Sequence, residues 1–240
     1  MKMKNTLLYT ISIFLLLTVT TSYSQEEKTA IDSVPKPKVT HSLRFGVDVS
    51  KPILGLFKKD YSGIAFVADY RIRNNYYIAT EFGLETRTFE ETTFSYTTKG
   101  SFYKIGFDYN LYENLIGMNN MIYVGLRYGR SDFSHEILSY TTNTSNQYWN
   151  SASHSGTTYN NLNASWATVL LGLKAETFKN VFIGASLQIN RLLSQKQPDG
   201  FQNLYAPGYN RIGLNDLSAG FNYTISYMIP LTKKKQAVDE

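Results

Sequence analysis

The sequence has no cysteine and little charge, and each shortage excludes a class of protein. The absence of Cys among its 240 residues excludes disulfides, thiolate metal sites, a cysteine nucleophile and an N-terminal lipidated cysteine. Charged residues make up only 18% of the chain, which excludes a disordered polyelectrolyte. The formal charge of +5 falls to 22 basic minus 19 acidic residues, or +3, once Lys2 and Lys4 are removed with a leader. That excess is too small to predict binding to nucleic acid.

Long apolar runs are also absent, except for one at the N-terminus. Two lysines precede an apolar core of residues 7–19, and two serines supply small residues before an expected cut near Gln25. The alternative is a membrane anchor, but this core is shorter than the roughly 20 residues that a bilayer-spanning helix needs. We therefore expect residues 1–24 to be a signal peptide and residues 25–41 to be a polar periplasmic lead-in.

Aromatic residues, by contrast, are abundant, with 19 Tyr and 14 Phe, and such side chains are common in strands. From Ser42 onward, apolar residues occupy every second position in eight segments, most regularly between Leu217 and Ile229. Alternation of this kind predicts half-buried strands. The predicted strands lie near residues 43–49, 64–71, 76–87, 103–109, 122–129, 167–176, 181–190 and 217–229.

The connections between these segments alternate between short and long. The short ones lie near residues 73–75, 113–119 and 178–180, and the longest runs from about residue 131 to 163. An even-stranded, up-and-down barrel with both termini at the short-turn end has this arrangement. Outer-membrane barrels show it as short periplasmic turns and long external loops.

Alternation alone leaves open which face of the barrel is outside, because a secreted lipocalin-like barrel would hold the apolar face inside. Glycines favour the membrane barrel, since they lie on the polar face, where an eight-stranded interior has room only for packed side chains. These glycines are Gly46, Gly63, Gly83, Gly106, Gly125, Gly129, Gly172, Gly184 and Gly220. Segment length agrees, because about 9–11 tilted residues cross a bilayer.

Aromatic residues of the apolar face lie near the strand ends, as interfacial girdles require. Tyr70, Tyr76, Tyr109 and Tyr227 would mark the short-turn end, and Tyr103 and Tyr128 the other end. The sequence thus predicts an all-β fold, an eight-stranded antiparallel up-and-down transmembrane β-barrel over residues 42–231, followed by a charged periplasmic tail, 232–240.

The polar face then lines the lumen with six positive and six negative residues. They are Arg44, Asp48, Asp69, Arg71, Glu81, Glu85, Arg87, Lys104, Asp108, Arg127, Lys174 and Glu176. Balanced charges can satisfy one another in a packed interior, whereas an unpaired buried charge is costly. We expect an ion-pair network that fills the bore; the alternative is a path for a substrate or protons.

The last segment carries a candidate assembly signal. Ser218, Gly220, Tyr223 and Ile225 fit the order polar, glycine, aromatic, hydrophobic that barrel assembly machinery reads in terminal strands. The usual form ends at a terminal aromatic residue, whereas this chain continues past Ile229 into a lysine-rich tail.

Over residues 42–231, the chain resembles the small outer-membrane β-barrel proteins of Gram-negative bacteria, in the size class of OmpX and the OmpA transmembrane domain. The Tyr- and Asn-rich composition and the Ser-Tyr-Ser-Gln end of the leader resemble uncharacterised Bacteroidetes families. The resemblance implies the fold and a location in the cell outer membrane, and it transfers no catalytic residue.

Candidate chemistry is sparse. Ser134, His135 and Glu136 supply the residue types of a nucleophile, a base and an acid, but neighbours on a strand point to opposite faces. The histidines have no metal-ligand spacing. We expect no catalytic, metal or cofactor site, and therefore no enzyme.

The predicted long loop and one pair of lysines remain as contact candidates. Tyr140, Tyr148, Trp149 and Tyr159 lie among Ser and Asn residues, a composition typical of recognition surfaces, although the rings could equally pack within the loop. Lys58 and Lys59 could meet lipopolysaccharide. The leading hypothesis is a structural or interaction protein whose partners are outer-membrane lipid, the assembly machinery and a protein of an outer-membrane complex. A narrow channel is the second hypothesis, and a lipid-modifying enzyme is the third.

Overall fold

The computed structural model describes residues 41–91, 94–114, 118–141, 153–154, 156–198, 202–213 and 215–231. The chain divides into two compact units, Met1–Lys38 and Val39–Glu240, and every described residue belongs to the second. The expected signal peptide, nearly all of the lead-in and the charged tail lie outside the described residues. Within the described ranges, no helix is long and apolar enough to cross a membrane.

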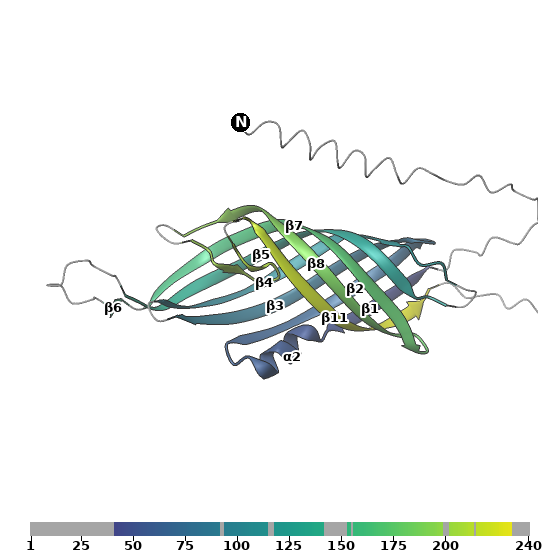
Figure 1. Cartoon of the computed structure of the whole chain (residues 1–240), viewed down its shortest axis with the longest axis horizontal. Coiled ribbons are helices and arrows are strands. Elements are labelled where there is room, and N and C mark those ends of the chain that lie inside the picture. Colours follow the sequence, from purple (N-terminus) through teal and green to yellow (C-terminus); the bar gives the residue numbers. More distant parts are fainter. Residues whose placement is uncertain are drawn as a thin grey trace, which may run out of the picture. The chain divides into compact units, whose positions relative to one another are not determined.

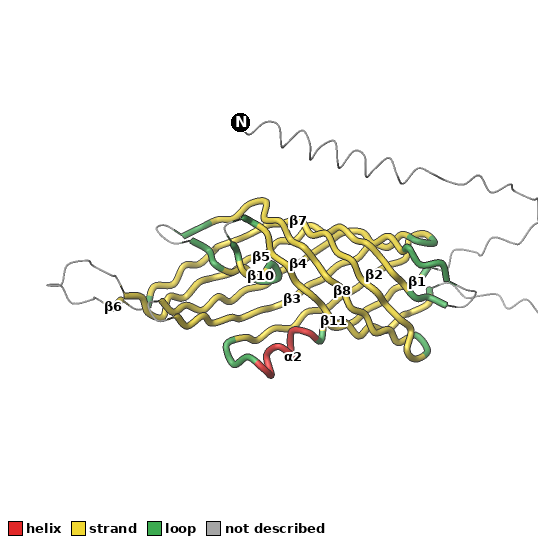
Figure 2. Tube along the Cα trace, viewed as in Figure 1, coloured by secondary structure: helices red, strands yellow, loops and turns green. Residues whose placement is uncertain are grey.

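Eight antiparallel strands form a closed ring (Figures 1 and 2). They are β1 (Ser42–Asp48), β2 (Tyr61–Arg73), β3 (Tyr76–Glu91), β4 (Phe94–Asn110), β5 (Met121–Thr141), β7 (Thr157–Phe178), β8 (Val181–Lys196) and β11 (Leu217–Pro230). Each pairs with the next along the chain, and β11 pairs with β1 to close the ring. The predicted eight-stranded antiparallel barrel is confirmed.

Apolar and polar residues alternate along the strands. The apolar side chains point out of the barrel, and the polar side chains point into it. Leu126 is 64% exposed, whereas Lys104 is 1% exposed. All eight strands contribute exposed apolar residues: Phe45, Phe66, Ile78, Phe82, Phe107, Leu126, Val169, Leu171, Leu187, Ile189, Phe221 and Ile225. The two faces are therefore assigned as the sequence predicts.

The strands at the loop end run further than predicted. The expected connection over residues 131–163 is wrong at both ends, because β5 continues to Thr141 and β7 begins at Thr157. The connection between β3 and β4 is likewise short, since β3 ends at Glu91 and β4 begins at Phe94. These extensions are rich in Ser and Thr and lack the outward apolar pattern, yet the backbone ladder of hydrogen bonds continues through them.

Three strands of two residues each complete the secondary structure of the described residues. A two-residue strand, β6 (Ser153–His154), pairs with the end of β5. The strands β9 (Tyr205–Ala206) and β10 (Asn210–Arg211) pair with each other in the β8–β11 connection.

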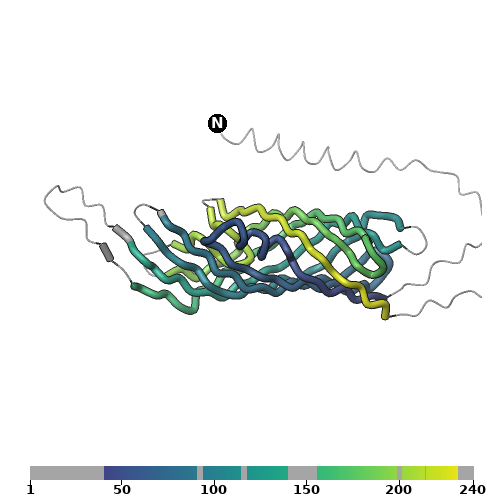
Figure 3. The backbone as a smooth tube through the Cα atoms, turned by 90° about the horizontal axis from the view of Figure 1, so that it is seen from below, coloured from purple at the N-terminus to yellow at the C-terminus, as the bar shows by residue number. Residues whose placement is uncertain are grey.

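One strand of the ring is short, and a helix takes its place. The β1–β11 ladder ends where the amide of Val49 donates to the carbonyl of Tyr223, and the chain then enters α2 (Ser50–Phe57). From Val49 toward the loop end of the barrel, β2 and β11 have no strand between them. The helix lies beside both strands at this gap in the ladder (Figure 3).

Candidate functional site: the barrel interior

A charged triad spans the bore toward its short-turn end. Asp69 on β2 accepts from Arg44 Nε on β1 at 2.6 Å and from Lys174 Nζ on β7 at 2.5 Å. Arg44 faces Asp69 directly in the β1–β2 register, but β7 lies four strands away around the ring. Aromatic rings surround the cations, with Tyr77 4.9 Å from the Arg44 guanidinium and Tyr123 5.3 Å from the Lys174 ammonium. The triad therefore joins opposite walls of the barrel.

Two further ion pairs link neighbouring strands. Lys104 faces Glu81 in the β3–β4 register, with Nζ 3.3 Å from Oε2, and it also donates to Oε1 of Gln188 on β8 at 3.3 Å. Arg127 reaches Asp108 diagonally, with Nη2 2.6 Å from Oδ1.

The diagonal pair depends on two glycines. Arg127 faces Gly106, and Asp108 faces Gly125, in the β4–β5 register. A Cβ on Gly125 would collide with the Asp108 carboxylate and lie 3.1 Å from Nη1 of Arg127. Glycine therefore leaves the space in which the two charged groups meet.

Glu85 on β3 joins four donors from three other elements. Its Oε1 accepts from Lys51 Nζ of α2 at 2.5 Å and from the Tyr61 hydroxyl of β2 at 3.1 Å. Its Oε2 accepts from the Tyr205 hydroxyl at 2.6 Å and from the Gly208 amide at 3.0 Å. Burial raises the pKa of the Tyr205 phenol well above its usual value, so this group stays protonated and donates.

The β9–β10 hairpin plugs the bore at the loop end. Ala206 and Tyr209 are fully buried and pack in one apolar cluster with Phe102 and Trp166. Gly208 has φ +74°, and a Cβ there would collide with the Phe102 ring, so both its conformation and its packing require glycine.

Polar groups of the barrel wall hold the hairpin backbone. The Tyr209 carbonyl accepts from the Ser218 hydroxyl at 2.6 Å and from Asn190 Nδ2 at 3.3 Å. Ser218 is one of the four residues of the predicted assembly signal; of the others, Gly220 lies on the inner face of β11, and Tyr223 and Ile225 point outward. These contacts give Ser218 a structural task in addition to the predicted signal, which remains a prediction.

Four of the twelve predicted lumen charges, Asp48, Arg71, Glu176 and Arg87, do not take part in the ion pairs described above. Asp48 accepts from the amide and hydroxyl of Ser50 at the start of α2. Arg71 donates to the Asn74 carbonyl in the β2–β3 turn, and its guanidinium lies 5.8 Å from the Tyr77 ring, so its part in the charge network stays a prediction. Glu176 accepts from the Asn180 amide in the β7–β8 turn. Arg87 lies against the rings of Phe89 and Tyr205, at 4.6 and 5.3 Å.

The loop-contact residues are mostly outside the described structure or within strands. Tyr148 and Trp149 lie outside the described residues, and Tyr140 is part of β5. Tyr159 is also a strand residue, in β7, and packs against the buried cluster that contains Trp166. Its expected place in an external loop is therefore corrected, since the loop is shorter than predicted.

His135 is likewise a buried strand residue. It pairs with Thr98 Oγ1 at 2.7 Å and with Asn203 Oδ1 at 3.1 Å, while Ser134 and Glu136 lie on the opposite face of β5. This geometry separates the Ser-His-Glu residue types. Among the described residues, no three His, Asp or Glu side chains are grouped to hold a metal ion.

Interior groups that come from connections between strands were not predicted from the sequence. Lys51 lies on α2, and Tyr205 and Gly208 lie on the hairpin, where no period of two marks an inward side. Gln188 and Asn190 on β8 could have been found, because they alternate with apolar residues in a predicted strand.

Comparison with known proteins places the chain in a family. The family described as "Domain of unknown function (DUF6048)" matches residues 6–234. The chain belongs to this family. No curated protein matches it.

Two solved structures of one small protein are similar to this DUF6048 chain. Ail, the attachment invasion locus protein of Yersinia pestis, is 14% identical, with a TM-score of 0.38, over 80% of this chain and 97% of Ail. Ail in complex with the heparin analogue sucrose octasulfate gives the same identity and coverage and a TM-score of 0.36.

Two pockets lie at the inner face of the described barrel. One pocket of about 50 Å³ lies between the Asp69 triad and the ion pairs of Lys104 and Arg127. Its lining includes Asp69, Lys104, Arg127 and Lys174. A second, of about 110 Å³, lies where α2 replaces a strand. The first exceeds the roughly 10–15 Å³ that one water molecule needs, so it can hold water.

Proposed function

We propose that this DUF6048 protein is an outer-membrane β-barrel with a closed lumen that acts by contact, through its external loops or as a subunit of an outer-membrane complex. The single observation that carries the closed lumen is the contact between Lys174 and Asp69, which joins walls four strands apart. Ions that crossed this level would have to break a buried triad in which Asp69 binds both cations, which is costly.

The outer face supports the membrane location. Apolar residues are exposed on all eight strands, and the facing pair Phe107 and Leu126 are 63% and 64% exposed. In water, such a continuous apolar belt would be unfavourable, because soluble monomers rarely expose apolar patches of this kind. In a bilayer the same belt matches the hydrocarbon.

Tyrosines lie at the borders of this belt. Tyr76 and Tyr109 face each other beside the short-turn end, with ring centroids 5.0 Å apart. On β5, the outward row changes from Leu126 and Tyr128 to the charged Arg130. Aromatic side chains at the two membrane interfaces are typical of outer-membrane barrels.

The closed bore leaves the loop end and the termini as the surfaces for partners. The partners we propose are outer-membrane lipid and lipopolysaccharide, the barrel assembly machinery during insertion, and a protein of the same membrane. Lys58 and Lys59, exposed directly after α2, are placed to meet anionic head groups. We further propose that residues 1–24 are a cleaved signal peptide and that the tail after residue 231 is periplasmic.

Two measurements test the proposal. Purified protein in planar bilayers should remain electrically silent, and steady conductance of the size of a general porin would refute contact as the mode of action. Protein from membranes should migrate differently on a gel before and after heating and should begin near Gln25. An unshifted band would refute the barrel in the membrane, and a full-length N-terminus would refute the cleaved leader.

A further inference from the structure

The wall of the barrel is interrupted between β2 and β11. The ladder between β1 and β11 covers Thr224–Pro230 of β11, and Val49 makes its last backbone bond to Tyr223. From Leu217 to Asn222, the side of β11 that would bind β1 has no strand beside it, because the chain has turned into α2. This interruption is a place where a molecule in the surrounding membrane could reach the interior without entering through either end.

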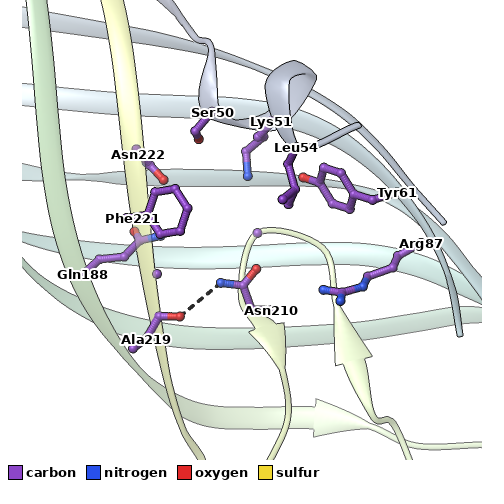
Figure 4. Close-up of a pocket in the computed structure, with 12 residues that line it drawn as sticks. Ser50, Lys51, Leu54, Tyr61, Arg87, Gln188, Asn210, Ala219, Phe221 and Asn222 are labelled. Atoms are coloured by element: carbon purple, nitrogen blue, oxygen red, sulfur yellow. Dashed lines mark hydrogen bonds between the residues drawn. The ribbon is translucent and has the colours of Figure 1, made fainter. Parts of the chain in front are cut away.

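A pocket of about 110 Å³ lies at this interruption (Figure 4). Its lining includes inward residues, Gln188 and Asn222, and outward residues of β11, Ala219 and Phe221. The pocket therefore lies along the edge of β11 that faces α2 and contacts residues of both faces of that strand. It is smaller than the roughly 300–1,000 Å³ of sites that enclose a whole ligand, so it suits one small polar head group.

The inner end of the pocket is cationic. Lys51 and Arg87 both line it, and Lys51 is already paired with Glu85. Arg87 has no carboxylate within ion-pair distance among the described residues, and its buried Nε has no hydrogen-bond partner there. The other carboxylates that act on Lys51, Asp48 and Glu81, do not line the pocket. An anion beside Arg87 would supply the missing partner.

The outer rim of the interruption is apolar. Phe221 is 54% exposed on β11, and Leu56 and Phe57 of α2 are 83% and 84% exposed. These side chains match acyl chains rather than water. Gly220 keeps the passage between rim and interior open, because a Cβ there would lie 2.7 Å from Nε2 of Gln188.

We propose that this interruption is a binding site for a lipid with an anionic phosphate head group, entered sideways from the bilayer. The phosphate lies against the Arg87 guanidinium, whose planar donors fit phosphate oxygens, and the acyl chains remain outside against α2 and Phe221. This site rests on the membrane location proposed above, and it adds a specific ligand to a barrel whose lumen is otherwise filled.

The test is lipid binding by the purified full-length barrel, measured by native mass spectrometry in detergent. Phosphatidylglycerol and phosphatidylcholine with the same acyl chains are offered together. The wild type should retain one phosphatidylglycerol with an affinity about tenfold higher than for phosphatidylcholine, as one charge-assisted contact gives. Equal retention of the two lipids would overturn the site.

Variants locate the binding. Arg87→Gln should abolish the preference for the anionic lipid, and Arg87→Lys should keep part of it, because the charge remains. Gly220→Val should reduce binding of the anionic lipid by filling the passage with no change in charge. The matched control, Lys99→Gln with Lys196→Gln, removes two exposed charges outside the pocket and should leave the preference intact. If the control lost as much as Arg87→Gln, binding would be surface attraction and the site would be refuted.

Two further results separate the possible failures. Inorganic phosphate added in excess should not displace the lipid; displacement would show a site for free phosphate and overturn the sideways entry of a lipid. Heat-dependent gel migration of each variant reports the folded barrel independently. A protein that folds into membranes but shows no lipid preference would refute this site and leave the proposed function standing.

Discussion

The ammonium of Lys174 lies 2.5 Å from Oδ2 of Asp69, although β7 and β2 are four strands apart in a ring of eight. The same carboxylate accepts from Arg44 through its other oxygen. A single buried Asp thus connects both sides of the bore.

Replacing Lys174 with Met should destabilise the barrel by about 2 kcal/mol, because a charged hydrogen bond is lost while Asp69 keeps Arg44. Denaturant unfolding in lipid, followed by the gel shift, measures the loss. Lys179→Met in the exposed β7–β8 turn is the matched control and should change stability by less than about 0.5 kcal/mol. Equal effects of the two changes would show that the triad adds no stability.

Replacing Arg127 with Leu should cost about 3 kcal/mol, because Asp108 is left buried without a cation. The double variant that adds Asp108→Asn should recover part of the loss, since the stranded charge is gone. Arg130→Leu on the same strand is the control, because Arg130 is half exposed and lies 3.6 Å from an exposed Asp132. No recovery in the double variant would contradict the pairing.

The glycines of the inner face report how tightly the bore is packed. A Cβ on Gly172 would lie 2.5 Å from the Tyr123 ring, so Gly172→Ala should destabilise by about 1–3 kcal/mol through overpacking. Gly213 has open space around it, and Gly213→Ala should be neutral. A neutral Gly172→Ala in the same unfolding assay would mean that the interior can adjust to an added methyl group.

Leu126 tests which face meets the lipid. Leu126→Arg should cost about 2–4 kcal/mol if the residue lies near the bilayer midplane. Glu136→Arg, outward on the same strand but beyond the apolar belt, is the control and should be nearly neutral. Unfolding from lipid vesicles measures both, and a harmless Leu126→Arg would mean that the outer face does not contact hydrocarbon.

The sequence predicts the barrel well because one physical rule applies to every strand. Apolar residues such as Phe107 and Leu126 must face outward together, so a period of two identifies the strands and both faces. The pairs Arg44–Asp69 and Lys104–Glu81 follow from that rule once the register is known. The register itself depends on backbone hydrogen bonds, which the alternation does not specify.

The rule fails where the chain leaves the apolar belt. The extensions of β5 and β7 need no apolar outward face, so residues such as His135 and Tyr159 were expected in a loop. The helix α2 and the hairpin have no period of two, and their inward groups, Lys51 and Tyr205, could not be identified from spacing. These aperiodic segments close the bore and line the interruption of the wall, so the least predictable parts of the chain carry the candidate site.

Glu85 provides a test of the hairpin plug that is separate from the ion pairs below it. Glu85→Ala removes the acceptor of Tyr205 and Gly208 and leaves Lys51 without its carboxylate, so the hairpin should loosen. Faster hydrogen exchange and new protease cleavage within residues 202–213 would report this. Glu90→Ala, at an exposed position of the same strand, should change neither.

The bore should nevertheless stay closed in Glu85→Ala. The Lys104–Glu81 pair and the triad on Asp69 do not involve Glu85, and they fill the barrel between the hairpin and the short-turn end. Bilayer recordings of this variant should therefore remain silent while its hairpin exchanges quickly. Conductance in Glu85→Ala would show that the hairpin alone closes the barrel, and unchanged exchange would show that Glu85 does not hold the hairpin.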